Sequence, residues 1–150
     1  MQQSKQCECI KGEMMKTYSD LMKLSTFEDS YKYLKLGGIV GKETFGTQRY
    51  LNQKFYTSDE WKRIRNHVIL RDNGCDLAVP GRELYQRIYI HHLNPITPDD
   101  ILQHSDCVID PEFLICCSYN THQAIHYGDE SLLFFDLVER KPFDTCPWRT

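Results

Sequence analysis

Two stretches of the chain, ELYQRIYIHH at 83–92 and EFLICCSYNTHQAIHYG at 112–128, determine which fold the sequence predicts. In the first, apolar and polar residues alternate up to a pair of histidines, which is typical of a strand. The second begins with a short apolar run, a second strand, and continues as a helix that Gly128 ends. The order strand, loop, strand, helix predicts a domain of the α+β class.

Two helices are expected before these strands. One runs from about 26 to 36, and a longer one covers WKRIRNHVILRDNG at 61–74, where apolar residues recur at helical spacing and Gly74 supplies the end. Each begins near a pair with capping-box spacing: Ser25 with Glu28, and Thr57 with Glu60. The second helix is the most strongly predicted element of the chain.

The rest of the chain reads as connections and arms. Four glycines among aromatic residues predict an ordered loop over 37–56, and the acidic stretch PDDILQHSD at 98–106 is expected to connect the two strands. We therefore divide the sequence into an N-terminal helical and loop arm (1–56), a central domain (57–129) and an extended C-terminal tail (130–150).

Composition excludes several classes of protein. The 150 residues are 41% hydrophobic and 26% charged, which is typical of one folded domain and excludes a disordered or collagen-like chain. No apolar run is long enough for a membrane span, and the N-terminus lacks the pattern of a secretory signal. We expect a soluble cytoplasmic protein without a membrane partner, in which the seven cysteines are reduced.

Charge is distributed unevenly along the chain. The formal net charge is −3, but residues 32–90 carry eleven Lys and Arg against six Asp and Glu, a formal charge of +5. The polar side of the longer helix concentrates four of these cations: Lys62, Arg63, Arg65 and Arg71. Such a face could contact the phosphates of DNA or could be an ordinary solvated surface.

Four of the six histidines form two compact groups. His122 and His126 are four residues apart, so a helix places both imidazoles on one face, where they could bind one metal ion. His91 and His92 are adjacent on a strand, so their side chains point to opposite sides. Only one of that pair can easily join the helical histidines, which leaves the other for acid–base chemistry near neutral pH.

The segments IHHLNP (90–95) and LICCSYNTHQAIHYG (114–128) resemble the HNH nuclease family, which has a ββα-metal fold. The similarity runs from about Trp61 to Gly128, and small phage-encoded HNH proteins look similar almost throughout. The resemblance implies a metal-dependent endonuclease that hydrolyses DNA phosphodiester bonds. It implies that His91, His122 and His126 bind the metal, that His92 is the general base, and that Arg87 is a candidate to grip the scissile phosphate.

The resemblance also implies a cofactor and partners. One divalent ion is expected, with zinc, nickel, manganese and magnesium as candidates, and three nitrogen ligands favour the first three. The expected partner is DNA, with phage packaging proteins such as terminase as further candidates, in the cytoplasm of the host cell. Two alternatives stay open: a noncatalytic nucleic-acid or protein binding module on the same scaffold, and a purely structural metal domain.

One departure from the family pattern concerns the central asparagine, which in the family braces the loop that carries the base. That position falls near Phe113. Asp110, Asn94 or Asn120 could substitute for it.

A second departure concerns the structural zinc that many relatives bind with two CxxC pairs. The corresponding positions hold Cys75, Ala78, Ser118 and Thr121, so we expect no structural zinc. Cys116 and Cys117 are expected to be small buried side chains without chemistry.

Overall fold

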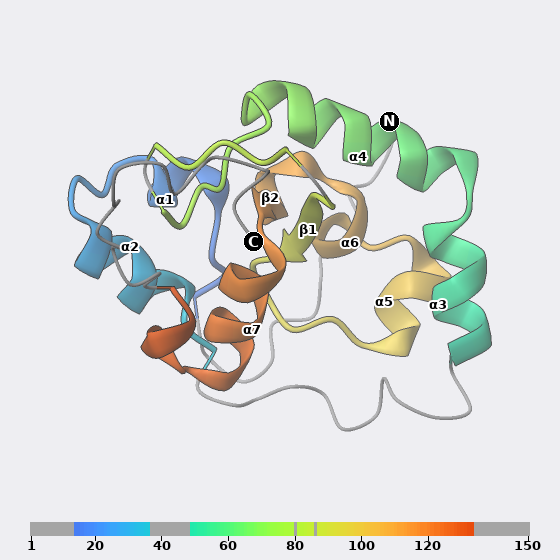
Figure 1. The fold of residues 1–150 in the computed structure, drawn as a ribbon. Coiled ribbons are helices and arrows are strands. Elements are labelled where there is room, and N and C mark those ends of the chain that lie inside the picture. Colours follow the sequence, from blue (N-terminus) through green and yellow to red (C-terminus); the bar gives the residue numbers. More distant parts are fainter. Residues whose placement is uncertain (1–13, 37–48, 80, 86, 134–150) are drawn as a thin grey trace, which may run out of the picture.

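Two short antiparallel strands lie at the centre of the fold, with helices on both sides (Figure 1). The structure, a computed structural model, describes residues 14–36, 49–79, 81–85 and 87–133. The strands are β1 (Tyr89–His92) and β2 (Leu114–Cys117). The helices are α1 (Tyr18–Leu21), α2 (Phe27–Leu34), α3 (Arg49–Tyr56), α4 (Asp59–Arg71), α5 (Pro98–Gln103), α6 (Asp106–Ile109) and α7 (Tyr119–Tyr127), with 3₁₀ turns η2 (Pro111–Phe113) and η3 (Glu130–Leu132). This mixture confirms the α+β class.

The two strands separate two hydrophobic clusters. His92 pairs with Leu114 and Tyr89 with Cys117, so successive side chains of each strand alternate between the two faces. Leu114 packs in the cluster that contains Trp61 and Val68 of α4. The second cluster joins Ile115 of β2 and Ile125 of α7 to the N-terminal helices, through Leu21 and Leu34.

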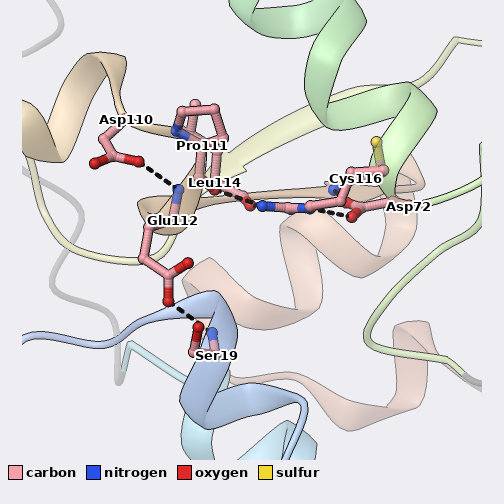
Figure 2. Close-up of polar contacts among 8 residues, drawn as sticks. Ser19, Asp72, Asp110, Pro111, Glu112, Leu114 and Cys116 are labelled. Carbon is pink, nitrogen blue, oxygen red and sulfur yellow. Dashed lines mark hydrogen bonds and ion pairs between the residues drawn. The ribbon is translucent and has the colours of Figure 1, made fainter.

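The outer edge of β2 is closed by side chains from the end of α4 (Figure 2). The guanidinium of Arg71 donates to the carbonyl oxygens of Pro111 and Leu114, each at 2.6 Å, and to the carboxylate of Asp72. The buried carboxylate of Asp72 accepts a hydrogen bond of 2.8 Å from the backbone N–H of Cys116. A two-stranded sheet is only marginally stable alone, and these contacts satisfy its exposed edge.

Arg71 therefore does not extend the cationic outer face of the helix, as the sequence suggested it could. Its guanidinium lies over the ring of Tyr18, 3.6 Å from the ring centroid. In the same region Ser19 donates its backbone N–H to Glu112 at 2.9 Å (Figure 2). Arg71 thus helps to attach α1 to the turn before β2.

A buried carboxylate ties the segment after α4 to the start of α7. Asp76 accepts hydrogen bonds from the backbone N–H groups of Ala78 and Ser118, at 3.1 and 3.2 Å, and from the hydroxyl of Thr121 at 2.5 Å. The guanidinium of Arg82 lies 3.9 Å away. Three of the four positions considered above for zinc ligands thus surround one acidic side chain, which cross-links the two segments.

The caps of two helices lie one residue later than the sequence pattern suggested. Thr26, not Ser25, accepts from the backbone N–H of Asp29 at the start of α2, and Ser58, not Thr57, accepts from that of Trp61 at the start of α4. A capping residue must itself stay extended, and both observed caps have β-region dihedrals. Spacing alone did not distinguish neighbouring hydroxyl residues.

Two connections were predicted wrongly, and only the first residues of the predicted C-terminal tail can be compared. Part of the expected loop over 37–56 is helix α3, and 37–48 lie outside the described residues. The stretch 98–106 forms helix α5 and the start of α6 in place of a plain connection, and Thr97 and Asp100 make a complete capping box before it. The tail after 129 begins with η3 and the buried Leu133, and 134–150 lie outside the description.

The first strand is shorter than predicted, because β1 begins at Tyr89 and Arg87 has a positive φ of 38°. Cys116 and Cys117 are buried on β2 as expected, and burial raises the pKa of both thiols, for Cys116 to about 12. No helix in the part of the chain that the structure describes is long and apolar enough to span a membrane.

Candidate metal centre

Three imidazoles meet between β1 and α7. One ring nitrogen from each of His91, His122 and His126 lies within 4.8 Å of the others. The Nε2 atoms of His122 and His126 are 3.1 Å apart, close enough to share a proton or to bind one ion. The structure therefore brings together the three residues that the sequence assigned as metal ligands.

The elements explain why these side chains converge. The side-chain oxygen of Ser118 caps α7 by accepting from the N–H of Thr121 at 3.1 Å, and Gly128 ends the helix with a φ of 69°. Within this single helix His122 and His126 are one turn apart on the same face. On β1, His91 pairs with Ile115, whose side chain belongs to the cluster on the α7 side of the sheet.

His91 is buried without the contacts that a buried imidazole normally needs. Its side chain is 1% exposed, and neither Nδ1 nor Nε2 has a hydrogen-bond partner among the described residues. Leaving a buried polar group unpaired costs about 1–3 kcal/mol. A cation bound to His91 and to its two neighbours would satisfy this group, so the residues present fit a metal ion.

The protonation state of the cluster also suits a metal. Burial, and then the neighbouring His122 and His126, lower the pKa of His91 well below its ordinary value. Burial lowers the pKa of His122 to about 4, with a smaller effect of His126, and it also lowers the pKa of His126. Neutral imidazoles are the form that binds metal ions.

The three-histidine group borders a cavity on one side. Among the described residues no fourth His, Cys, Asp or Glu side chain joins the group. His122 and His126 line a cavity of about 460 Å³, whereas His91 lies behind them and does not line it. Three protein ligands with a free position are typical of catalytic zinc sites, whereas structural sites are closed by four.

His92 points away from the three-histidine group but lines the same cavity. Its ring stacks on Trp61 with the centroids 5.6 Å apart and the planes 14° from parallel, and it meets the ring of Tyr56 at 6.3 Å. Burial lowers the pKa of His92 to about 4, and a hydrogen bond with the backbone of Val108 partly opposes the decrease. His92 is therefore neutral at pH 7, with Nε2 unpartnered among the described residues.

Phe113, at the position where the family resemblance expects an asparagine, bonds to the chain after His92 only through its backbone. The carbonyl of Phe113 accepts from the N–H of Leu93, directly after His92, at 2.9 Å. Of the residues considered as substitutes, Asn94 exchanges two hydrogen bonds with the backbone of Lys16, and Asp110 accepts from the N–H of Glu112. Asn120 lies half-buried on α7. The described contacts of the His92 ring are with Val108 and the aromatic rings of Trp61 and Tyr56.

Of the basic residues that the sequence predicted to contact phosphate, some lie at the cavity and others on the outer surface. Arg65 is half-buried, lines the cavity and donates to the carbonyl of Ile88 at 3.1 Å. Lys62 and Arg63 are exposed on α4. Arg87 is exposed before β1 and is not among the residues that line the cavity. Arg87 was a candidate because it lies on the predicted strand of the histidine pair, whereas the arginine that lines the cavity with His92 is Arg65 of α4.

The chain matches no protein-family model, no curated protein and no solved structure. Its site combines three neutral imidazoles in ligand geometry, a fourth neutral imidazole and an arginine around one cavity. These groups can hold a divalent ion, accept a proton and bind an anion.

Proposed function

We propose that this protein is a metal-dependent endonuclease of the HNH type that hydrolyses DNA phosphodiester bonds. The observation that carries the proposal is the three-histidine group of His91, His122 and His126, which opens into a cavity that His92 shares. The order β1, β2, α7 around this group also fits a ββα-metal core.

The three histidines would bind one divalent ion, with zinc, nickel and manganese better suited to nitrogen ligands than magnesium. When bound, the ion would offset the negative charge that develops on the phosphate oxygens in the transition state. The ligands come from one strand and one capped helix, which already bring their ring nitrogens close together and so favour this role.

His92 would act as the general base. Its neutral ring removes a proton from a water molecule as that water attacks phosphorus opposite the leaving 3′ oxygen. Stacking on Trp61 and the hydrogen bond with Val108 hold the ring, and Nε2 is buried without a hydrogen-bond partner among the described residues. A positioned base of this kind contributes about 10²–10⁴-fold to a rate.

Arg65 replaces Arg87 as the residue that we expect to grip the scissile phosphate. Its guanidinium donates one hydrogen bond to the carbonyl of Ile88 and has further N–H groups that could donate to a phosphate oxygen. Lys62 and Arg63, on the outside of the same helix, would contact the flanking backbone, and DNA affinity should then fall steeply as salt is raised.

The test is conversion of a supercoiled plasmid in EDTA and with zinc, nickel, manganese or magnesium. We expect cleavage with at least one metal, none in EDTA, and none by a His122→Ala variant purified in the same way. His67→Ala changes an exposed histidine of α4 outside the cluster and should cleave like the unmodified protein.

Other results would favour the other functions. Salt-dependent binding of DNA without cleavage under any metal would indicate the noncatalytic binding module. Full activity of His122→Ala would exclude the proposed metal centre.

A further inference from the structure

The cavity beside the three-histidine group has walls that a phosphate alone does not require. Besides the histidines, aromatic side chains line it from four elements: Tyr56 at the end of α3, Trp61 in α4, Tyr89 in β1 and Tyr127 in α7. Tyr127 is 67% exposed and Tyr56 is 36% exposed, so flat apolar rings face solvent at the site where the chemistry is proposed. Exposed aromatic rings grouped in this way are typical of a binding surface.

The polar groups among these rings suit a nucleotide. Half-buried amides of Asn52 and Gln123 line the cavity together with the guanidinium of Arg65. None of the lining residues in the described part of the chain is an aspartate or a glutamate. The cavity thus combines stacking surfaces, hydrogen-bonding amides and a positive charge.

The cavity is too small to hold a base pair that is still stacked between its neighbouring base pairs. About 460 Å³ is in the range of small-molecule pockets, roughly 300–1,000 Å³, and is far smaller than a segment of duplex. A base presents its flat face to an aromatic ring only when it leaves the stack of the helix. Removing it from a duplex costs a few kcal/mol, a cost that single-stranded or unpaired DNA does not carry.

We propose that this cavity binds the base of an unpaired nucleotide next to the scissile phosphate, by stacking on Tyr127 and Tyr56. The inference depends on the DNA substrate of the proposed function and makes it more specific: the preferred substrate is single-stranded DNA or a duplex with an unpaired nucleotide. Fully paired DNA would have to release a base before the phosphate could reach His92.

The test measures binding without turnover. Fluorescence anisotropy in EDTA compares three labelled DNAs of one sequence: a perfect duplex, the same duplex with one bulged nucleotide, and that bulge with an abasic site. We expect the bulged duplex to bind at least fivefold more tightly than the perfect one, and the abasic bulge to lose the gain. In Tyr127→Ala the affinity for the bulged duplex should fall by about 5- to 150-fold, the equivalent of 1–3 kcal/mol for stacking one base.

Two controls separate stacking from other effects. Tyr127→Phe keeps the ring and should keep the preference, and Tyr85→Ala removes a tyrosine that is 86% exposed and does not line the cavity. Equal affinity for perfect and bulged duplexes, or a wild-type preference in Tyr127→Ala, would overturn the inference. Because no metal is present, this result is independent of the plasmid assay, in which failure would instead refute the nuclease.

Discussion

Replacing His91 by leucine should stabilise the metal-free protein while abolishing its response to metal. His91 is 1% exposed and has two unpartnered ring nitrogens, and its ring meets those of His122 and His126 edge-on at 5.4 and 5.0 Å. A leucine of similar size would remove the buried polar atoms and fill the same space. The gain expected from removing an unpaired buried group is about 1–3 kcal/mol.

Thermal unfolding in EDTA and with added metal measures both effects. At 2–4 °C per kcal/mol for a chain of this size, the metal-free His91→Leu protein should melt roughly 2–12 °C above the unmodified protein. Metal at a hundred times its dissociation constant should stabilise the unmodified protein by about 2.7 kcal/mol and the variant not at all. His67→Leu, at an exposed histidine, should retain the full response to metal. A His91→Leu protein that melts lower without metal yet still responds to it would refute the reasoning.

Three further changes test other parts of the structure. Asp76→Ala leaves buried hydrogen-bond donors unpaired, so we expect urea unfolding to show a loss of about 3–5 kcal/mol in the free energy of unfolding. The control Asp99→Ala, at an exposed residue, should lose less than about 1 kcal/mol. Equal urea midpoints for the two variants would exclude the cross-link between the segment after α4 and the start of α7. Because the folded pKa of His122 is about 4 against an ordinary 6.5, the folded state binds fewer protons between these values, so metal-free stability should fall as pH decreases from 6.5 to 4. A His122→Leu variant should lose less stability over that window, and an identical loss would contradict the lowered pKa. Arg65→Gln removes one charged hydrogen bond and should lower kcat/KM for DNA cleavage by about 10- to 150-fold. Arg87→Gln should lower kcat/KM by much less. If Arg87→Gln had the larger effect, Arg87 and not Arg65 would be the residue that binds the phosphate.

Most of the three-histidine group could be predicted from local geometry, and the resemblance to HNH nucleases then selected His91 over His92. Helical spacing fixes the relation of His122 to His126, and alternation along a strand separates His91 from His92. Only the approach of the strand to the helix is a long-range feature, and the strand, strand, helix order already implied it. The structure accordingly brings together the expected three ligands.

The contacts that depend on tertiary packing could not be read in the same way. Arg71 ends α4 as one of four cations on that helix, and only the docking of β2 and Tyr18 reveals that it is directed inward. Trp61 is expected in the core from the sequence, and its stacking on His92 depends on tertiary packing that brings side chains of α4 and β1 together. The capping box of Thr97 and Asp100 was a visible signal of α5 that the acidic, loop-like composition obscured.

The rate of single-turnover DNA cleavage by His92→Ala at saturating metal tests the proposed mechanism most directly. His92 is outside the three-histidine group, so calorimetry should find one ion bound with nearly unchanged affinity. Cleavage should nevertheless be slower by about 10²–10⁴-fold, the contribution of a general base. A variant that retains its metal and cleaves DNA within tenfold of the unmodified rate would contradict the assignment of His92 as the base, and so would one whose activity disappears only because the metal is lost.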